Sequence, residues 1–180
     1  IKSELKSRMT FSNFDTKGNR AEPTGQESLQ RAFSAAKLFA EEPSGWLVLV
    51  GPEGSGKTHL AIAVVREIEN NGEYVCFAFV PDLLDHLRYT FSPQSSVTYD
   101  QLFEDVRTSP YLVLDDLGSH SCTPWAEEKL YQIIVHRHEA RLPTIITLRD
   151  FMEDHLPTPV QSRLKDISIV GSYTHVRAHE

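Results

Sequence analysis

The chain has 180 residues, of which 40% are hydrophobic and 24% charged, which is enough material for one globular domain with a buried core. Its formal net charge of −7 at pH 7 excludes a protein whose whole surface attracts nucleic acid, so any such contact must be local. No apolar run approaches membrane-spanning length and no signal peptide is recognisable, so we expect no membrane partner.

The cysteines bear on the cellular location. Cys76 and Cys122 lie far apart in the sequence and outside any C-x-x-C spacing. This usage is typical of reduced thiols, and we therefore expect a cytoplasmic protein. The first residue is Ile1 rather than Met, so we also expect the chain to begin partway through a longer protein.

Residues 1–22 are polar and irregular, and we interpret them as an N-terminal extension before a core over residues 23–180. Phe11 and Phe14 are notable in this segment because two aromatic rings need apolar surface to cover them. They either pack on the domain or border the base of a bound nucleotide. From Pro23 onward, apolar residues recur at helical spacing, which predicts a helix that ends near residues 43–45.

The pattern G-x-x-x-x-G-K-[ST], a phosphate-binding loop, follows an apolar predicted strand at residues 46–50. A helix-compatible run over residues 59–70 comes after it, so the loop has the strand–loop–helix context that the pattern requires. The residues that we assign to nucleotide binding are Gly51, Pro52, Glu53, Gly54, Ser55, Gly56, Lys57, Thr58 and His59.

Each part of this loop has a physical role in binding phosphate. The glycines let backbone N–H groups turn inward, and the N-terminus of the following helix adds partial positive charge. Lys57 can reach the β- and γ-phosphates, and the Thr58 hydroxyl can ligate Mg²⁺. The carboxylate of Glu53 must point away from the nucleotide, and His59 is expected to pack locally. A glycine-rich turn before an ordinary helix is the alternative interpretation.

The rest of the sequence alternates predicted strands with predicted helices. Strands are predicted over residues 74–80, 111–116, 143–148 and 167–170, and helices over residues 81–89, 99–107 and 124–141. This alternation predicts a parallel sheet covered by helices on both faces. His136 and His138 lie two positions apart on a predicted helix and therefore point apart, so we expect a solvated surface there and no metal site.

The strand over residues 111–116 ends in two carboxylates, Asp115 and Asp116. In a protein with a phosphate-binding loop, such a strand delivers its first acid to Mg²⁺, so Asp115 and Thr58 are the predicted metal ligands. The second acid, Asp116, can orient or deprotonate a water that faces the γ-phosphate. A strand that ends in a solvated Asp-Asp turn is the alternative.

Five further stretches carry a specific resemblance. They are Thr-Phe-Ser-Asn-Phe-Asp at residues 10–15, Pro-Asp-Leu-Leu-Asp-His-Leu-Arg at 81–88, Leu-Val-Leu-Asp-Asp-Leu-Gly at 112–118, Pro-Thr-Ile-Ile-Thr at 143–147 and Ser-Arg-Leu at 162–164. With the phosphate-binding loop, they make the chain resemble the ATPase domain of DnaC/DnaI-type helicase loaders and of the related IstB-type transposition helper ATPases, within the AAA+ superfamily.

The resemblance implies an α/β fold of the P-loop NTPase class and AAA+ type. This fold has three αβα layers and a five-stranded parallel sheet in the order 5-1-4-3-2. It implies that Thr147 lies at the end of the sensor-1 strand and acts in catalysis with Lys57 and Asp116. It also implies that Arg163 is an arginine finger that acts in trans on the ATP of a neighbouring subunit. A surface arginine in a short helix is the alternative for Arg163.

The sequence departs from the family pattern in two places. The family usually continues after the sensor-1 threonine with Ser-Asn, whereas this chain has Leu148 and Arg149. The role of sensing the γ-phosphate is therefore vacant here, or it has passed to Thr147 or Arg149. No clear lid domain follows residue 170, so we expect slow hydrolysis in an isolated subunit.

The resemblance implies a function as an ATPase that binds ATP or ADP with Mg²⁺ and loads a helicase in DNA replication. The implied partners are single-stranded DNA, a replicative helicase or a transposase, and further copies of the chain. We expect DNA contacts from residues 81–99, where Arg88, Tyr89 and Phe91 combine a cation with stacking rings; the alternative is that these rings are core residues or exposed loop residues. The alternative functions are an IstB-type transposition helper, a nucleotide-binding scaffold with little hydrolysis, and a P-loop kinase, for which no Arg-rich lid segment is visible.

Overall fold

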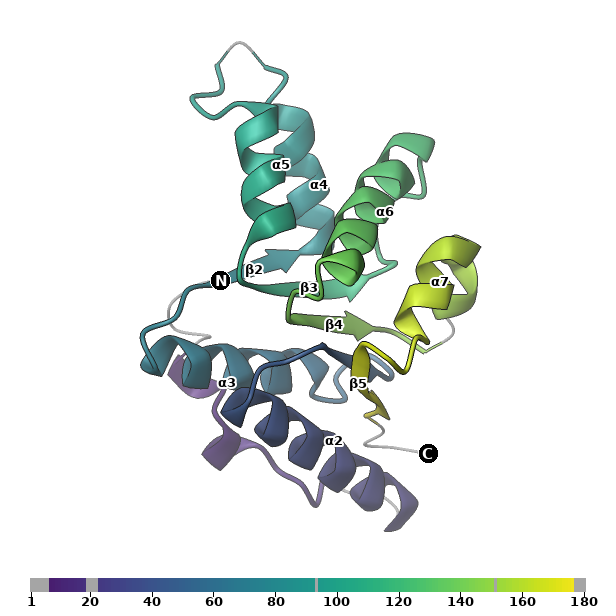
Figure 1. The fold of residues 1–180 in the computed structure, drawn as a ribbon. Helices are drawn as coiled ribbons and strands as arrows, with labels where there is room; N and C mark the ends of the chain where they lie inside the picture. The colour runs from purple at the N-terminus through teal and green to yellow at the C-terminus, as the bar shows by residue number, and fades with distance from the viewer. Residues whose placement is uncertain (1–6, 19–22, 93, 151, 177–180) are drawn as a thin grey trace.

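The computed structural model describes residues 7–18, 23–92, 94–150 and 152–176, which form three layers with a sheet in the middle (Figure 1). The strands are β1 Trp46–Val50, β2 Val75–Phe79, β3 Tyr111–Leu117, β4 Thr144–Leu148 and β5 Val170–His175. All neighbours pair in parallel in the order β2-β3-β4-β1-β5. This is the predicted order 5-1-4-3-2 read from the other edge, so the prediction of a five-stranded parallel sheet is confirmed.

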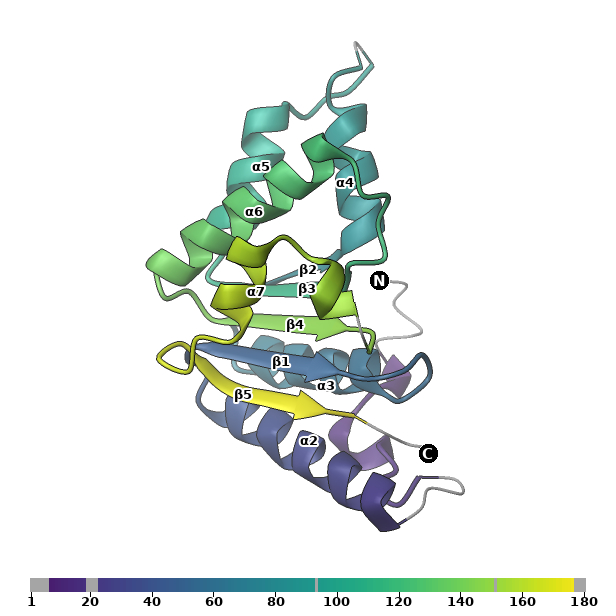
Figure 2. The same cartoon turned by 90° about the vertical axis from the view of Figure 1, so that its right-hand side faces the viewer.

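Helices cover both faces of the sheet (Figures 1 and 2). On one face lie α2 Pro23–Glu41 and α3 Lys57–Asn70. On the other lie α4 Val80–Tyr89, α5 Tyr99–Thr108, α6 Pro124–Glu139 and α7 Thr158–Leu164. Two short 3-10 helices, η1 Phe11–Asn13 and η2 Met152–His155, complete the described elements. No helix in the described ranges is both long and apolar enough to cross a membrane.

The strand before the phosphate-binding loop is buried along its whole length. Trp46, Val48 and Val50 join the core beneath α4–α7, whereas Leu47 and Leu49 join the core beneath α2 and α3. Each such side chain contributes about 1.5–3 kcal/mol relative to an exposed one. A shift of this strand by one residue would move every side chain to the opposite face, so burial fixes where the strand ends and where the loop begins.

The predicted position of the fifth strand is wrong. Residues 167–169 form a turn, Ile167 is 93% exposed, and β5 begins only at Val170. The turn forms because Asp166 accepts hydrogen bonds from the backbone N–H of Ser168 at its side chain and from that of Val170 at its carbonyl. The hydrogen bonds that Ser168 supplies lower the pKa of Asp166 to about 2. The sequence of β5 is mostly polar, which an edge strand tolerates because it has a neighbouring strand, β1, on one side.

The expectation of a solvated surface at the histidines of α6 is wrong for His138. Its side chain is 19% exposed, and its Nε2 lies 2.8 Å from Oδ2 of Asp166. The imidazole also packs edge-on against the indole of Trp46, with 5.8 Å between ring centroids. This histidine therefore joins α6 to the turn before β5.

Part of the predicted N-terminal extension packs on the domain. Phe11 and Phe14 both contact the ring of Phe33 on α2, with centroid distances of 5.5 and 5.9 Å. The packing alternative for these two rings is thus observed. Residues 1–6 and 19–22 of the extension lie outside the described residues, and the division of the chain at residue 22 stays a prediction.

Candidate nucleotide-binding site

The sheet brings three chain segments together at its carboxyl edge. Leu148, the last residue of β4, lies opposite Val50 of β1 and opposite Leu117 of β3. The backbone N–H of Gly51 donates to the carbonyl of Leu148 at 3.1 Å, which ties the start of the phosphate-binding loop to β4. The two predicted acidic residues and the loop therefore meet at one edge, although 57 positions separate Thr58 from Asp115.

Glycine is required at two positions of the loop. Gly56 has a φ of 99°, a left-handed conformation that disfavours other residues, and it immediately precedes α3. A Cβ on Gly51 would lie 2.1 Å from the carbonyl oxygen of Val176, which no side chain can tolerate. The loop thus needs its glycines both for its turn and for its close contact with the chain after β5.

Lys57 begins α3 and is 7% exposed. Its Nζ donates to the backbone carbonyl of Pro52 at 2.7 Å, so the ammonium group sits over the loop. Burial lowers the pKa of Lys57, and the nearby Asp116 and Asp115 act against this shift. A bound phosphate would compensate the cost of holding this charge away from water.

Asp115 and Thr58 form the predicted metal-binding pair. The Thr58 hydroxyl donates to Asp115, with distances of 3.0 and 3.2 Å to its two carboxylate oxygens. Asp115 is 5% exposed, and burial raises its pKa, although the hydrogen bonds from Thr147 and Thr58 act against this shift. The pair offers hard oxygen donors next to the phosphate-binding loop, a donor set that suits Mg²⁺.

Thr147 positions both acids. Its buried hydroxyl donates to Oδ1 of Asp115 at 2.8 Å and accepts the backbone N–H of Asp116 at 2.8 Å. The hydroxyl proton is thus already used within the chain, so Thr147 acts as a positioning residue in this arrangement. Its predicted role near the γ-phosphate stays a prediction.

Asp116 has an unusual backbone. Its φ is 59°, a left-handed conformation that few residues other than glycine adopt, although aspartate tolerates it better than most. Its carboxylate faces Arg149 at the end of β4, and two hydrogen bonds of 3.2 Å join the two side chains. Sequence reasoning did not foresee this pair. The one signal was the replacement of the family's Ser-Asn by Leu148 and Arg149.

Two other predicted residues lie at the edges of the site. The Glu53 side chain is 84% exposed and points into solvent, as the charge of the phosphate requires. His59 packs locally, as predicted: its Nε2 lies 2.8 Å from the carbonyl oxygen of Thr10, and its ring packs edge-on against Phe14. Phe14 also lies close to the phosphate-binding loop, because a Cβ on Gly56 would come within 2.7 Å of its ring.

The structure does not bring Arg163 to this edge. Arg163 lies in the last turn of α7, and the strand that follows begins at Val170, which pairs with Trp46 at the opposite end of β1 from the loop (Figure 2). Its Nη1 donates to the carbonyl of Pro159 at 2.8 Å, and its guanidinium lies over the ring of Tyr131. Arg163 therefore cannot serve the nucleotide of its own subunit without a large movement, and its role in trans stays a prediction.

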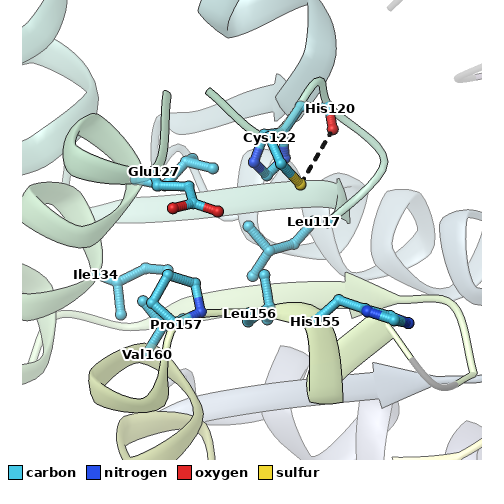
Figure 3. A pocket seen from close by; sticks show the side chains of 11 residues that line it. Leu117, His120, Cys122, Glu127, Ile134, His155, Leu156, Pro157 and Val160 are labelled. Carbon is cyan, nitrogen blue, oxygen red and sulfur yellow. Dashed lines mark hydrogen bonds between the residues drawn. The ribbon is translucent and has the colours of Figure 1, made fainter. Parts of the chain in front are cut away.

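A separate hollow opens beside the site, between the end of β3, α6 and the segment from η2 to α7 (Figure 3). Most of its lining is apolar, namely Leu117, Leu130, Ile134, Leu156, Pro157 and Val160. His120 and Glu127 border it, and burial lowers the pKa of His120. Among the described residues that line it there is no lysine or arginine, but an adjoining cavity that shares His120 and His155 with it reaches Arg149. Within the described part of the chain, no three side chains of the metal-ligating types gather around one point.

Comparisons with known proteins agree with this geometry. The chain is 28% identical over 153 residues to the replicative helicase loader DnaC of Escherichia coli strain K12, a match that covers 83% of this chain and 59% of the loader. It is 28% identical over 138 residues to the replicative helicase loader DnaI of Bacillus subtilis strain 168. This match covers 76% of this chain and 43% of the loader. The chain thus spans only about half the length of these curated relatives.

The fold comparison gives the same answer. A crystal structure of the DnaC helicase loader superposes with a TM-score of 0.78 at 23% identity, over 97% of this chain and 100% of that chain. This likeness confirms the predicted AAA+ type fold. The model of the family described as IstB-like ATP binding protein matches residues 2–156, which is most of the chain. The chain therefore belongs to the IstB-like ATP-binding protein family.

Proposed function

We propose that this chain is the Mg²⁺-dependent ATPase module of a helicase loader in DNA replication. The observation that carries the proposal is the contact of Thr58 with Asp115 beside the buried Lys57, at the edge where Asp116 also lies. The module would act on single-stranded DNA with a replicative helicase and with further copies of itself. Its cytoplasmic location stays a prediction.

The residues of the site divide the work as follows. The N–H groups of the phosphate-binding loop and Lys57 would hold the phosphates, and Thr58 and Asp115 would hold the magnesium ion. When bound, the ion neutralises part of the charge that develops on the transferred phosphoryl group. Asp116 accepts a hydrogen bond from a water that faces the γ-phosphate and keeps it in line.

Two substitutions test this assignment. Lys57→Ala should weaken the binding of ATP by about 10–100-fold, because a charge-assisted contact to phosphate is lost. Asp116→Asn should bind ATP at least as tightly as the parent but should release little phosphate, because the amide is a poor acceptor for the water's proton. Affinity is measured with a fluorescent ATP analogue, and turnover by phosphate release.

Lys37→Ala, which removes an exposed lysine of α2, is the matched control and should leave both quantities unchanged. Undiminished affinity in Lys57→Ala would refute the proposed nucleotide site. Full turnover in Asp116→Asn would instead remove only the role of Asp116. A parent that binds ATP but never hydrolyses it, with or without DNA, would favour the nucleotide-binding scaffold.

The choice between a helicase loader and a transposition helper rests on the named relatives. Both curated matches described above are replicative helicase loaders, whereas the family model carries the IstB description. We favour the loader because these relatives share 28% identity with this chain over 153 and 138 residues. Co-purification of the full-length protein with its host's replicative helicase, and failure to bind a transposase, is the expected result.

A further inference from the structure

Arg149 makes two charged contacts that the nucleotide site does not otherwise need. It follows β4 directly, and its Nε and Nη2 each donate to a different oxygen of the Asp116 carboxylate at 3.2 Å. Its Nη1 also lies 3.9 Å from Oε2 of Glu53 in the phosphate-binding loop. The guanidinium of Arg149 thus connects the loop that follows β1 with Asp116 on β3.

The position of this guanidinium is the important feature. The phosphate-binding loop faces the β- and γ-phosphates, and Asp116 faces the water beyond them. Arg149 bonds directly to Asp116, so its guanidinium lies beside the place that the γ-phosphate would take, whereas the exposed Glu53 carboxylate meets it from the solvent side. The Arg149 side chain is 42% exposed, whereas that of Asp116 is 18% exposed, so the arginine can move outward more easily than the acid.

The pairing holds the Asp116 carboxylate toward Arg149. Each of its oxygens accepts one hydrogen bond from the guanidinium, so fewer of its acceptor sites are left for a water. A phosphoryl group with two negative charges is a stronger partner for a guanidinium than one carboxylate, and it accepts the same two-pronged contact. ADP has no γ-phosphate and cannot compete for Arg149 in this way.

We propose that Arg149 is a latch that holds Asp116 in the absence of ATP and moves to the γ-phosphate when ATP binds. This inference rests on the proposed ATPase function and adds a residue that distinguishes ATP from ADP. Transfer of Arg149 has two effects at once: it adds a positive charge at the γ-phosphate, and it frees the Asp116 carboxylate to accept a hydrogen bond from water. The Ser-Asn of the family pattern has no charge that could do this, so the latch belongs to the Leu148-Arg149 departure of this chain.

A purely structural pair would behave differently. If Arg149 only tied β4 to β3, its removal would alter the binding of ATP and of ADP to the same extent. The ratio of the affinities for ATP and ADP therefore distinguishes the latch from a purely structural contact between β4 and β3. It can be measured without any turnover.

The experiment compares Arg149→Ala and Arg149→Gln with the parent, with Arg31→Ala on the exposed face of α2 as the control. The affinities for ADP and for a non-hydrolysable ATP analogue, both with Mg²⁺, are measured by isothermal titration calorimetry. In Arg149→Ala, the preference for the analogue over ADP should fall about tenfold or more, because a charge-assisted contact to phosphate is lost. Arg149→Gln keeps a polar stem without the charge and should lose the same preference.

A double-mutant cycle tests the latch itself. Asp116→Asn releases Arg149, so it should bind the analogue more tightly than the parent does, and this gain should vanish when Arg149→Ala is added. An unchanged preference for the analogue in Arg149→Ala overturns the latch but leaves the proposed ATPase intact. A parent that binds neither nucleotide overturns the proposed function, and the latch with it.

Discussion

At the scale of single residues, Arg137 is the least expected feature of the molecule. It is fully buried on α6, and burial lowers its pKa to about 10. Its guanidinium donates to the Thr144 hydroxyl at 2.9 Å and to the backbone carbonyls of Ser109 and Pro143 at 2.7 Å each. No ion pair of Arg137 is found in the described ranges, so neutral oxygens alone hold this charge.

These contacts have a consequence for the nucleotide site. Ser109 lies just before β3, and Pro143 lies just before β4. Arg137 thus holds the amino ends of the two strands whose carboxyl ends carry Asp116 and Arg149. An arginine guanidinium has five N–H donors, so this one side chain can donate to carbonyls of two different segments and hold them together.

Removal of Arg137 should therefore destabilise the whole domain. Arg137→Ala leaves a cavity and several buried carbonyls without donors, and we expect a loss of about 3–5 kcal/mol in the free energy of unfolding. Arg31→Ala, at an exposed site on α2, should change it by less than about 0.5 kcal/mol. Urea denaturation followed by circular dichroism measures both. Equal midpoints for Arg137→Ala and the parent would mean that the buried guanidinium contributes nothing net.

At the scale of elements, α4 and α5 carry the residues predicted to contact DNA. The rings of Phe91, Tyr99 and Phe103 stack in succession, with centroid distances of 5.1 and 5.5 Å. Arg88 lies over the indole of Trp125, 5.1 Å from its centroid. Phe91 and Tyr89 nevertheless remain 65% and 57% exposed, so neither ring is a core residue, and their contact with DNA stays a prediction.

The ring of Tyr89 is the one we consider most available to a base. It is 57% exposed at the end of α4, and Arg88 precedes it. The double substitution Arg88→Ala, Tyr89→Ala should weaken binding of a single-stranded oligonucleotide by about 5–100-fold, since one base–ring stack contributes about 1–3 kcal/mol. Fluorescence anisotropy at several salt concentrations measures this, and binding should weaken as salt rises.

Tyr74→Ala provides the matched control for this experiment. Tyr74 is 69% exposed, but it lies just before β2, at the end of that strand away from α4. We expect its removal to leave oligonucleotide binding unchanged. If the double variant binds as well as the parent does, residues 81–99 are not the DNA-contacting surface.

At the scale of the whole molecule, the separation of Arg163 from the nucleotide site suggests shared catalysis. The site supplies Lys57 and two acids, and Arg149 lies within it, but Arg163 lies in the last turn of α7, shortly before Val170, which pairs with the amino end of β1. An arginine supplied by another subunit accelerates other P-loop enzymes by about 10³–10⁵-fold. We expect the isolated subunit to be a weak ATPase whose activity per subunit rises with protein concentration.

Mixed variants test this expectation. Arg163→Ala should bind ATP normally and hydrolyse it poorly, and Lys57→Ala should do neither. A mixture of the two should regain activity, because one variant supplies the arginine and the other supplies the pocket. In the control, the double variant Lys57→Ala, Arg163→Ala replaces Lys57→Ala, and the mixture should stay inactive because this variant supplies neither the arginine nor the pocket. A mixture as inactive as either variant alone would exclude the arginine in trans.

The sequence by itself determined the features that depend on neighbouring residues. The phosphate-binding loop needs glycines at fixed spacings between a strand and a helix, and Gly56 does adopt a left-handed backbone that favours glycine. The buried strands were also predictable, because β1 is apolar throughout and β4 has an apolar centre, although β4 also buries Thr144 and Thr147. The strand order came from the resemblance to a known family, and the structure confirms it.

Only the tertiary structure decided the features that depend on distant residues. β5 was misplaced because an edge strand needs few apolar residues, whereas an exposed turn at residues 167–169 contains one, Ile167. No sequence pattern singled out Arg137, and Arg149 was marked in the sequence only as a departure from the family pattern, without an identified partner. Their partners lie 28 and 33 positions away, and only the packing of β3 beside β4 brings them within hydrogen-bond distance. Local patterns specify local geometry, whereas the pairing of charges across a sheet depends on which strands become neighbours.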